Sequence, residues 1–133
     1  MKDKEKIELF WKITKRINKK FCKNKLKLGE ISLFKKGELD ESFKEDGYYC
    51  SGLQTITIKK ESSLIYQLMI LSHELAHAYQ FQFLSNYYKK KKQKLKDNGA
   101  FSEKSCDKVM HDKLGGKINQ KFLREIDKML VYH

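Results

Sequence analysis

The sequence predicts a single α+β domain over residues 1–133, built from an N-terminal helix, a small antiparallel sheet, a central helix and C-terminal helices. Apolar residues recur at helical spacing near both ends and in the middle of the chain, whereas in one short region they alternate with polar residues as in a strand. The length of 133 residues and an apolar content of 40% allow one packed core. We therefore expect one globular unit.

The first helix is expected over residues 4–21. Its apolar positions recur at spacings of three and four, or sums of these, and lysines fill the opposite side, as is typical of an amphipathic helix. These positions are Ile7, Phe10, Trp11, Ile17 and Phe21.

The next region alternates between apolar and polar residues, and glycines separate its runs. We expect two or three short antiparallel strands here, with an acidic connection over residues 37–47. The alternating pairs are Leu26/Leu28, Ile31/Leu33 and Ile56/Ile58.

A central helix is expected to follow and to extend to Tyr88. Ser62 or Ser63 can cap its N-terminus. Because most of its circumference is apolar, this helix should be buried.

The C-terminal part begins with a run of charge at residues 89–96 and an Asn98-Gly99 turn. Helical spacing resumes near Ser102 and is expected to stop at Gly115-Gly116, because glycine commonly ends helices. A last amphipathic helix is expected over residues 118–132.

The central helix contains the motif HELAH, residues 73–77. Residues four apart lie on one face of a helix, so His73 and His77 can direct ring nitrogens at one metal ion. Glu74 points to the adjacent side, where it can exchange protons with a water that zinc activates. Because an unpartnered histidine or glutamate in an apolar helix would be costly, we favour a Zn²⁺ site over a buried hydrogen-bond network.

A catalytic zinc usually has three protein ligands, so a third is expected downstream. Glu103, Asp107 and His111 follow one another at four-residue spacing and so share one helix face. We expect Glu103 as the third ligand, with Asp107 holding the tautomer of a ligating histidine, and keep His111 as the alternative. Asn98 is a poor zinc ligand, and His133 at the chain end is discounted.

Taken together, these segments resemble the SprT-like family of zinc metallopeptidases over about residues 7–120. The resemblance implies a zincin-like fold, zinc ligation by His73 and His77, and a general base and acid at Glu74. Members usually supply the third ligand from a His-Gly pair, whereas this sequence has Asn98-Gly99. The matching segments, in order, are RINKKF, GYYCSGLQTITI, ILSHELAHAYQ, NGAF and LGGKI.

A second resemblance concerns GAFSEKSCD, residues 99–107. It is similar to the Glu-xxx-Asp helix of gluzincins and of IrrE/ImmA-like metallopeptidases. That similarity implies Glu103 as the third ligand and Asp107 as the support of a ligating histidine.

The chain carries 29 Lys and Arg against 17 Asp and Glu, a formal charge of +12. Such an excess attracts polyanions, although lysine-rich surfaces are also common without a partner. Lys89 to Lys92 can contact phosphates, and Tyr87 and Tyr88 can stack on unpaired bases. The SprT-like resemblance further implies substrates among DNA-associated proteins.

Three scattered cysteines without CxxC spacing indicate a reducing compartment. We expect a cytoplasmic protein without membrane association, because neither a signal peptide nor eighteen consecutive apolar residues are present. A lone cysteine is usually a small core residue, so neither Cys50 nor Cys106 is expected to bind the metal.

The expected function is zinc-dependent hydrolysis of a protein or peptide substrate. An edge strand such as QTITI, residues 54–58, can hold an extended peptide by strand addition. The alternative is a nucleic-acid-binding or partner-binding protein on the same scaffold, with a structural metal or none.

Overall fold

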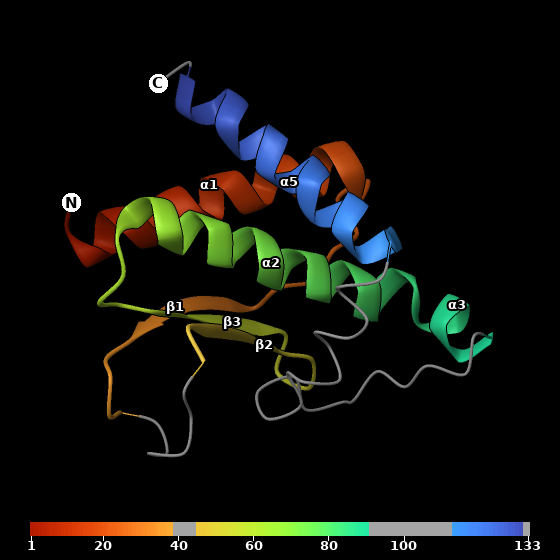
Figure 1. Cartoon of the computed structure of the whole chain (residues 1–133), viewed down its shortest axis with the longest axis horizontal. Helices are drawn as coiled ribbons and strands as arrows, with labels where there is room; N and C mark the ends of the chain where they lie inside the picture. The colour runs from red at the N-terminus through yellow and green to blue at the C-terminus, as the bar shows by residue number, and fades with distance from the viewer. Residues whose placement is uncertain (39–44, 91–112, 132–133) are drawn as a thin grey trace.

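The computed structural model describes residues 1–38, 45–90 and 113–131. Within them the chain is a mixed α+β structure in which helices lie on one side of a three-stranded sheet (Figure 1). The elements in order are α1 (Asp3–Phe21), β1 (Glu30–Phe34), β2 (Gly47–Cys50), β3 (Thr55–Lys59), α2 (Leu64–Phe83), α3 (Ser85–Lys90) and α5 (Lys113–Val131). The expected mixture of helix and sheet is confirmed.

The sheet has the strand order β1-β3-β2, so β3 is its centre. β3 pairs in parallel with β1, with Ile31 opposite Ile56, and antiparallel with β2, with Tyr49 opposite Ile56. The prediction of a purely antiparallel sheet is therefore wrong. The edge position expected for QTITI is also wrong, because β3 already has a strand on each side and cannot accept another.

Buried isoleucines hold the central strand in place. Ile56 and Ile58 are fully buried in β3, and Ile31 of β1 is buried beside them. The pairing of β2 with β3 follows from the tight connection at residues 51–54, where Gln54 adopts a left-handed φ of 54°. Of the acidic connection expected over residues 37–47, residues 39–44 lie outside the described residues, and Gly47 belongs to β2.

α2 lies between the sheet and α5, which explains why its sequence is apolar on most sides (Figure 1). Ser63 caps it as expected: its side-chain oxygen accepts a hydrogen bond of 3.2 Å from the backbone N–H of Tyr66. The helix ends at Phe83, and the short α3 carries the chain on to Lys90.

α5 runs through Gly115-Gly116, so the helix end predicted there is wrong. Each glycine costs a helix roughly 1 kcal/mol relative to alanine. Tertiary packing offsets this cost, because α5 buries an apolar stripe against the rest of the chain. The stripe consists of Ile118, Phe122, Ile126 and Met129.

A buried carboxylate joins α5 to α1. Glu125 is 1% exposed, and it accepts hydrogen bonds from Arg16 Nε at 2.6 Å and from Lys20 Nζ at 2.7 Å. These bonds, that from Lys20 first, hold the pKa of Glu125 below its usual value despite burial. The ion pairs thus fix the C-terminal helix against the N-terminal one.

In the part of the chain that the structure describes, no helix is long and apolar enough to cross a membrane.

Candidate metal centre

The two motif histidines meet on one face of α2. Nε2 of His73 and Nε2 of His77 are 2.9 Å apart, and the two rings are nearly perpendicular, at 88°. The helix produces this meeting directly, because a separation of four residues stacks side chains one turn apart. The prediction that these two side chains meet on one face of the helix is confirmed.

Glu74 completes the cluster from the adjacent side of the helix. Its Oε1 lies 3.9 Å from Nε2 of His73, and one ligand atom from each of the three residues lies within 4.8 Å of the others. Glu74 is 1% and His77 is 5% exposed, whereas the side chain of His73 is 28% exposed. Solvent and ligands therefore reach the cluster from the His73 side.

This donor set can hold a metal ion. Two imidazole nitrogens bound at about 2.0–2.1 Å to one tetrahedral zinc ion would be about 3.3 Å apart. The 2.9 Å separation is within a few tenths of an ångström of that spacing, although it also fits a hydrogen bond from one ring to the other. Imidazole nitrogen and carboxylate oxygen suit zinc and several other divalent metals, so the ligands do not select one of them.

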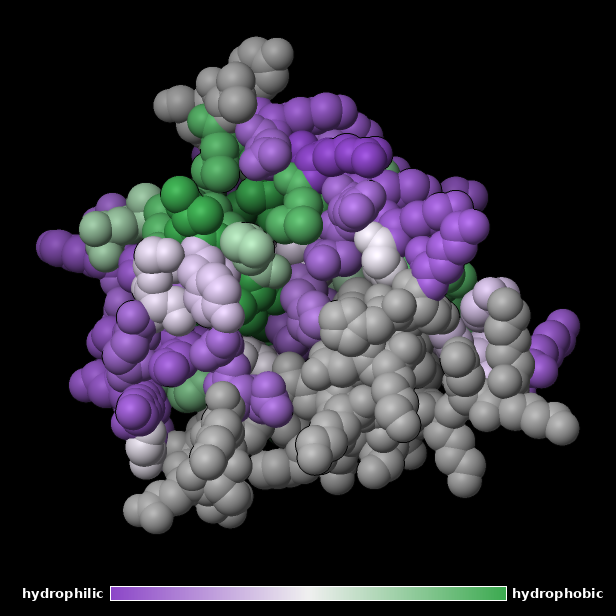
Figure 2. All heavy atoms as spheres, in the orientation of Figure 1, coloured by the Kyte–Doolittle hydropathy of each residue, from purple (hydrophilic) through white to green (hydrophobic). Residues whose placement is uncertain are grey.

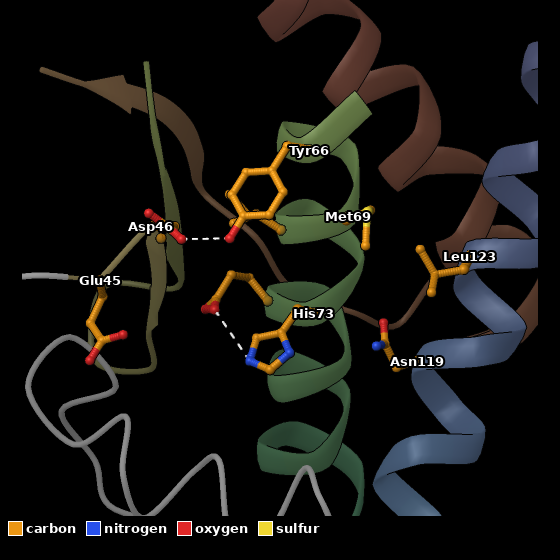
Figure 3. Close-up of a pocket in the computed structure, with 10 residues that line it drawn as sticks. Glu45, Asp46, Tyr66, Met69, His73, Asn119 and Leu123 are labelled. Atoms are coloured by element: carbon orange, nitrogen blue, oxygen red, sulfur yellow. Dashed lines mark hydrogen bonds and ion pairs between the residues drawn. The ribbon is translucent and has the colours of Figure 1, made fainter. Parts of the chain in front are cut away.

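A cavity of about 320 Å³ opens beside the cluster (Figure 3). His73 and Glu74 form part of its wall, and Tyr66 lies two turns before His73 on the same helix. In Figure 3 the tyrosine hydroxyl points across to Asp46, which accepts its hydrogen bond at 2.6 Å. From the opposite side, α5 supplies Asn119 and Leu123. The cavity thus lies over α2, between the start of β2 and α5.

Apolar surface borders this cavity. In the upper left part of Figure 2, hydrophobic residues gather over α2 and α5. Met69 of α2 lines the cavity and is 50% exposed. On the same two helices, Ile65 of α2 is 72% exposed and Leu130 of α5 is 41% exposed. Exposed apolar residues that adjoin a cavity are typical of a surface that binds a ligand or a protein segment.

The close approach of β2 to α2 depends on Gly47. A Cβ atom at this position would lie 2.5 Å from Cγ2 of Ile70 and 3.0 Å from the backbone oxygen of Thr57. Ile70 is one turn before Glu74, so the glycine sets how near the start of β2 comes to the cluster. Only a residue without a side chain fits this contact.

The third-ligand candidates Glu103 and His111 lie outside the described residues, as do Asp107 and Asn98. Glu103 therefore stays a prediction. Cys106 also lies outside them. Cys50 is a free, half-buried thiol on β2, and among the described side chains the cluster that can hold a metal comprises His73, Glu74 and His77.

Tyr88, one of the two tyrosines that could have stacked on bases, is not accessible to them. It is fully buried, and its hydroxyl accepts a hydrogen bond of 2.8 Å from Nε2 of Gln80. Tyr87 is 36% exposed, and Lys89 and Lys90 are exposed on α3. Lys91 and Lys92 lie outside the described residues.

Sequence reasoning missed Tyr66, Asp46, Asn119 and Leu123. A signal existed for Tyr66, because a separation of seven residues from His73 places it on nearly the same helix face. No local signal existed for the other three, whose position depends on how β2 and α5 pack against α2.

Comparisons of the chain with protein-family models, with curated proteins and with solved structures find no match.

Proposed function

We propose that the chain is a zinc-dependent metallopeptidase of the zincin type. The observation that carries the proposal is the cluster on α2: two ring nitrogens 2.9 Å apart, with the carboxylate of Glu74 beside them. His73 and His77 would hold the zinc ion, and Glu103 would supply the third ligand, with His111 as the alternative. A bound zinc ion lowers the pKa of water to about 7 and polarises a carbonyl oxygen.

Glu74 would act as the general base. It is buried beside His73 and forms part of the cavity wall, so a carbonyl group in the cavity lies within its reach. It would accept a proton from the attacking water and then donate it to the leaving amine. Its low exposure keeps bulk water away from this proton transfer.

The peptide would lie in the cavity beside His73 and Glu74 and not along QTITI, which belongs to the central strand β3. This cavity also has Gly47, the first residue of β2, in its wall. A peptide bound there would pass the proposed base.

The proposal is tested by zinc content and peptide hydrolysis measured on the same preparations. We expect about one zinc per wild-type chain, loss of zinc in His77→Ala, and retained zinc with loss of hydrolysis in Glu74→Gln. Loss of a general base typically lowers the rate by a factor of about 10²–10⁴. The matched control is Glu8→Gln, the same change at an exposed position of α1, which should retain both properties.

Circular dichroism establishes whether each variant is folded. A folded wild type that binds no zinc when refolded with it, or a Glu74→Gln variant as active as wild type, would contradict the proposal. Zinc contents of Glu103→Ala and His111→Ala then identify the third ligand.

A second candidate, binding of nucleic acid, is supported by the formal charge of +12. Replacement of Lys89 and Lys90 on α3, together with Lys91 and Lys92, by glutamine should weaken DNA binding and reduce its salt dependence. Fluorescence anisotropy with a labelled oligonucleotide at several salt concentrations measures both. If the chain binds nucleic acid, Glu74→Gln should leave DNA binding unchanged. We would assign DNA-associated proteins as substrates only if the chain both hydrolyses peptides and binds DNA.

A further inference from the structure

A second cavity, of about 280 Å³, lies at the C-terminal end of α2. Three segments that are far apart in the chain form its wall: the segment after α1, the end of β2 with the turn that follows it, and the last turn of α2. Phe81 in this wall follows His77 by one turn, so the cavity adjoins the candidate metal centre along the helix. The wall includes Lys25, Lys27, Gln54, Phe81, Gln82 and Phe83.

The segment that bears the two lysines is held by amide side chains of both neighbouring helices. Asn18 of α1 donates a hydrogen bond to the backbone oxygen of Leu26 at 3.1 Å and accepts one from its N–H at 2.9 Å. Gln82 of α2 bonds the backbone oxygen and N–H of Lys27 in the same way, at 2.7 Å and 2.8 Å. Leu26 is buried, whereas Lys25 and Lys27 are exposed. The backbone of both lysines is therefore already ordered, which lowers the entropic cost of binding an anion.

The two lysines end a long basic stretch of the sequence. Residues 9–29 contain no Asp or Glu, and all of them belong to the described part of the chain. Glu125 of α5 binds two of the basic residues in this stretch, Arg16 and Lys20. A group of cations of this kind attracts phosphate groups. The remaining basic residues of the stretch are all exposed: Lys12, Lys15, Lys19, Lys23, Lys25 and Lys27.

The other two walls supply aromatic rings and a side-chain amide. Phe83 is 37% exposed, and Phe81 is half-buried, with its ring centroid 6.5 Å from that of Tyr49. Aromatic side chains stack on nucleobases of every kind. Gln54 adds a side-chain amide, whose donor and acceptor groups suit the edge of a base. Its backbone oxygen accepts a hydrogen bond of 2.7 Å from the N–H of Gly29, which ties this wall to the lysine segment.

We infer that the second cavity binds one nucleotide, whose base lies against the phenylalanine rings and whose phosphate lies on the two lysines. Its volume of about 280 Å³ is near the lower end for small-molecule pockets, roughly 300 Å³, so it suits one base and not a stack of several. A free mononucleotide and an unpaired nucleotide of a strand both carry this chemistry. A base inside a duplex does not, because its faces are already stacked. The inference does not rest on the peptidase function, and it gives the second candidate function a site other than Lys89 to Lys92.

Isothermal titration calorimetry of the full chain with AMP, adenosine and ribose 5-phosphate tests the inference. Adenosine lacks the phosphate, and ribose 5-phosphate lacks the base. We expect AMP to bind at least about fivefold more tightly than either fragment, because stacking of a base and two exposed charge contacts each supply about that factor.

Substitutions in the wall assign the binding to this cavity. Lys25→Gln with Lys27→Gln should weaken AMP binding about fivefold. The matched control, Lys35→Gln with Lys36→Gln, removes the same charge from exposed positions just beyond the other end of β1 and should leave AMP binding unchanged. Phe83→Leu removes the ring and should weaken AMP binding at least about fivefold, whereas Phe83→Tyr retains the ring and should retain binding. Circular dichroism establishes that each variant is folded.

Fluorescence anisotropy with a labelled single-stranded oligonucleotide, and with the duplex of the same sequence at the same salt concentration, distinguishes the two sources of the nucleotide. If the source is a strand, the single strand should bind more tightly than the duplex, AMP should displace it, and Phe83→Leu should weaken it. If the source is a free nucleotide, AMP should bind without displacing either oligonucleotide.

Three results would overturn the inference. The first is AMP bound no more tightly than ribose 5-phosphate, the second is equal weakening by the cavity and control lysine pairs, and the third is a folded chain that binds neither AMP nor the single strand. Strand binding that depends on Lys89 to Lys92 and not on the cavity variants would overturn this site and leave the second candidate function standing. Peptide hydrolysis by the wild type bears on the peptidase proposal alone.

Discussion

Gly47→Ala is the substitution that most directly tests how the sheet edge is placed beside the candidate metal centre. The new Cβ atom would lie 2.5 Å from Cγ2 of Ile70 and 3.0 Å from the backbone oxygen of Thr57. Carbon atoms in van der Waals contact are about 3.5–4.0 Å apart, so either β2 or α2 must move by about 1 Å. Overpacking of this kind typically costs about 1–3 kcal/mol.

We expect the free energy of unfolding, measured by urea denaturation, to fall by that amount in Gly47→Ala. Ile70→Leu provides the matched partner, because leucine keeps the volume of isoleucine but has no methyl group on Cβ. Alone it should cost less than about 1.5 kcal/mol. In the double variant much of the cost of Gly47→Ala should disappear, giving a coupling of about 0.5–3 kcal/mol.

Two results would refute this reasoning about Gly47. One is a loss of less than about 0.5 kcal/mol in the single variant, within the range of ordinary surface substitutions. The other is a double variant whose loss of unfolding free energy equals the sum of the two single losses. That result would mean that the new methyl group does not contact Ile70. Zinc content should change little in the folded single variant, because His73 and His77 both lie on α2.

The other predictions concern stability and reactivity. Glu125→Gln removes the charge that binds Arg16 and Lys20, and it should cost about 1–3 kcal/mol in urea denaturation. Because the pKa of Glu125 is lower in the folded chain than its usual value of 4.5, its contribution is present above that value and lost as the pH falls through the folded pKa. Wild type should therefore lose more stability than Glu125→Gln on acidification below about pH 4.5, and parallel curves would contradict the assignment. Ser63→Ala removes the cap of α2 and should cost about 1 kcal/mol, whereas Ser63→Asp should retain most of it; equal losses would show that the cap bond is not the cause. Burial raises the pKa of the Cys22 thiol to about 11, so Cys22 should react with a thiol reagent at pH 8 only after unfolding, and fast reaction of Cys22 in the folded chain would be inconsistent with this burial.

Local patterns in the sequence were sufficient for individual helices. The spacing of apolar residues placed α1 to within one residue of its observed start, and Ser63 marked the start of α2. Both features act within one or two turns, where hydrogen bonding and side-chain direction depend only on near neighbours. The meeting of His73 and His77 is of the same kind.

Patterns that depend on distant partners were misjudged. Alternation shows that β3 is a strand, but it does not show which strands lie beside it, and the parallel pairing of β3 with β1 spans a connection that contains β2. Gly115-Gly116 resembles a helix end locally, yet α5 continues through it because the packing of its apolar stripe outweighs the cost of two glycines.

By itself the sequence determined the chemistry of the candidate metal centre, because a helix stacks residues four apart whatever surrounds it. Only the tertiary structure decided which surfaces meet that cluster. Asp46 and Asn119 reach its cavity from elements that are far apart in the chain, and Gly47 permits the approach of β2 to Ile70. Such contacts arise from the packing of whole elements, whose energies are spread over many residues and leave no short pattern in the sequence.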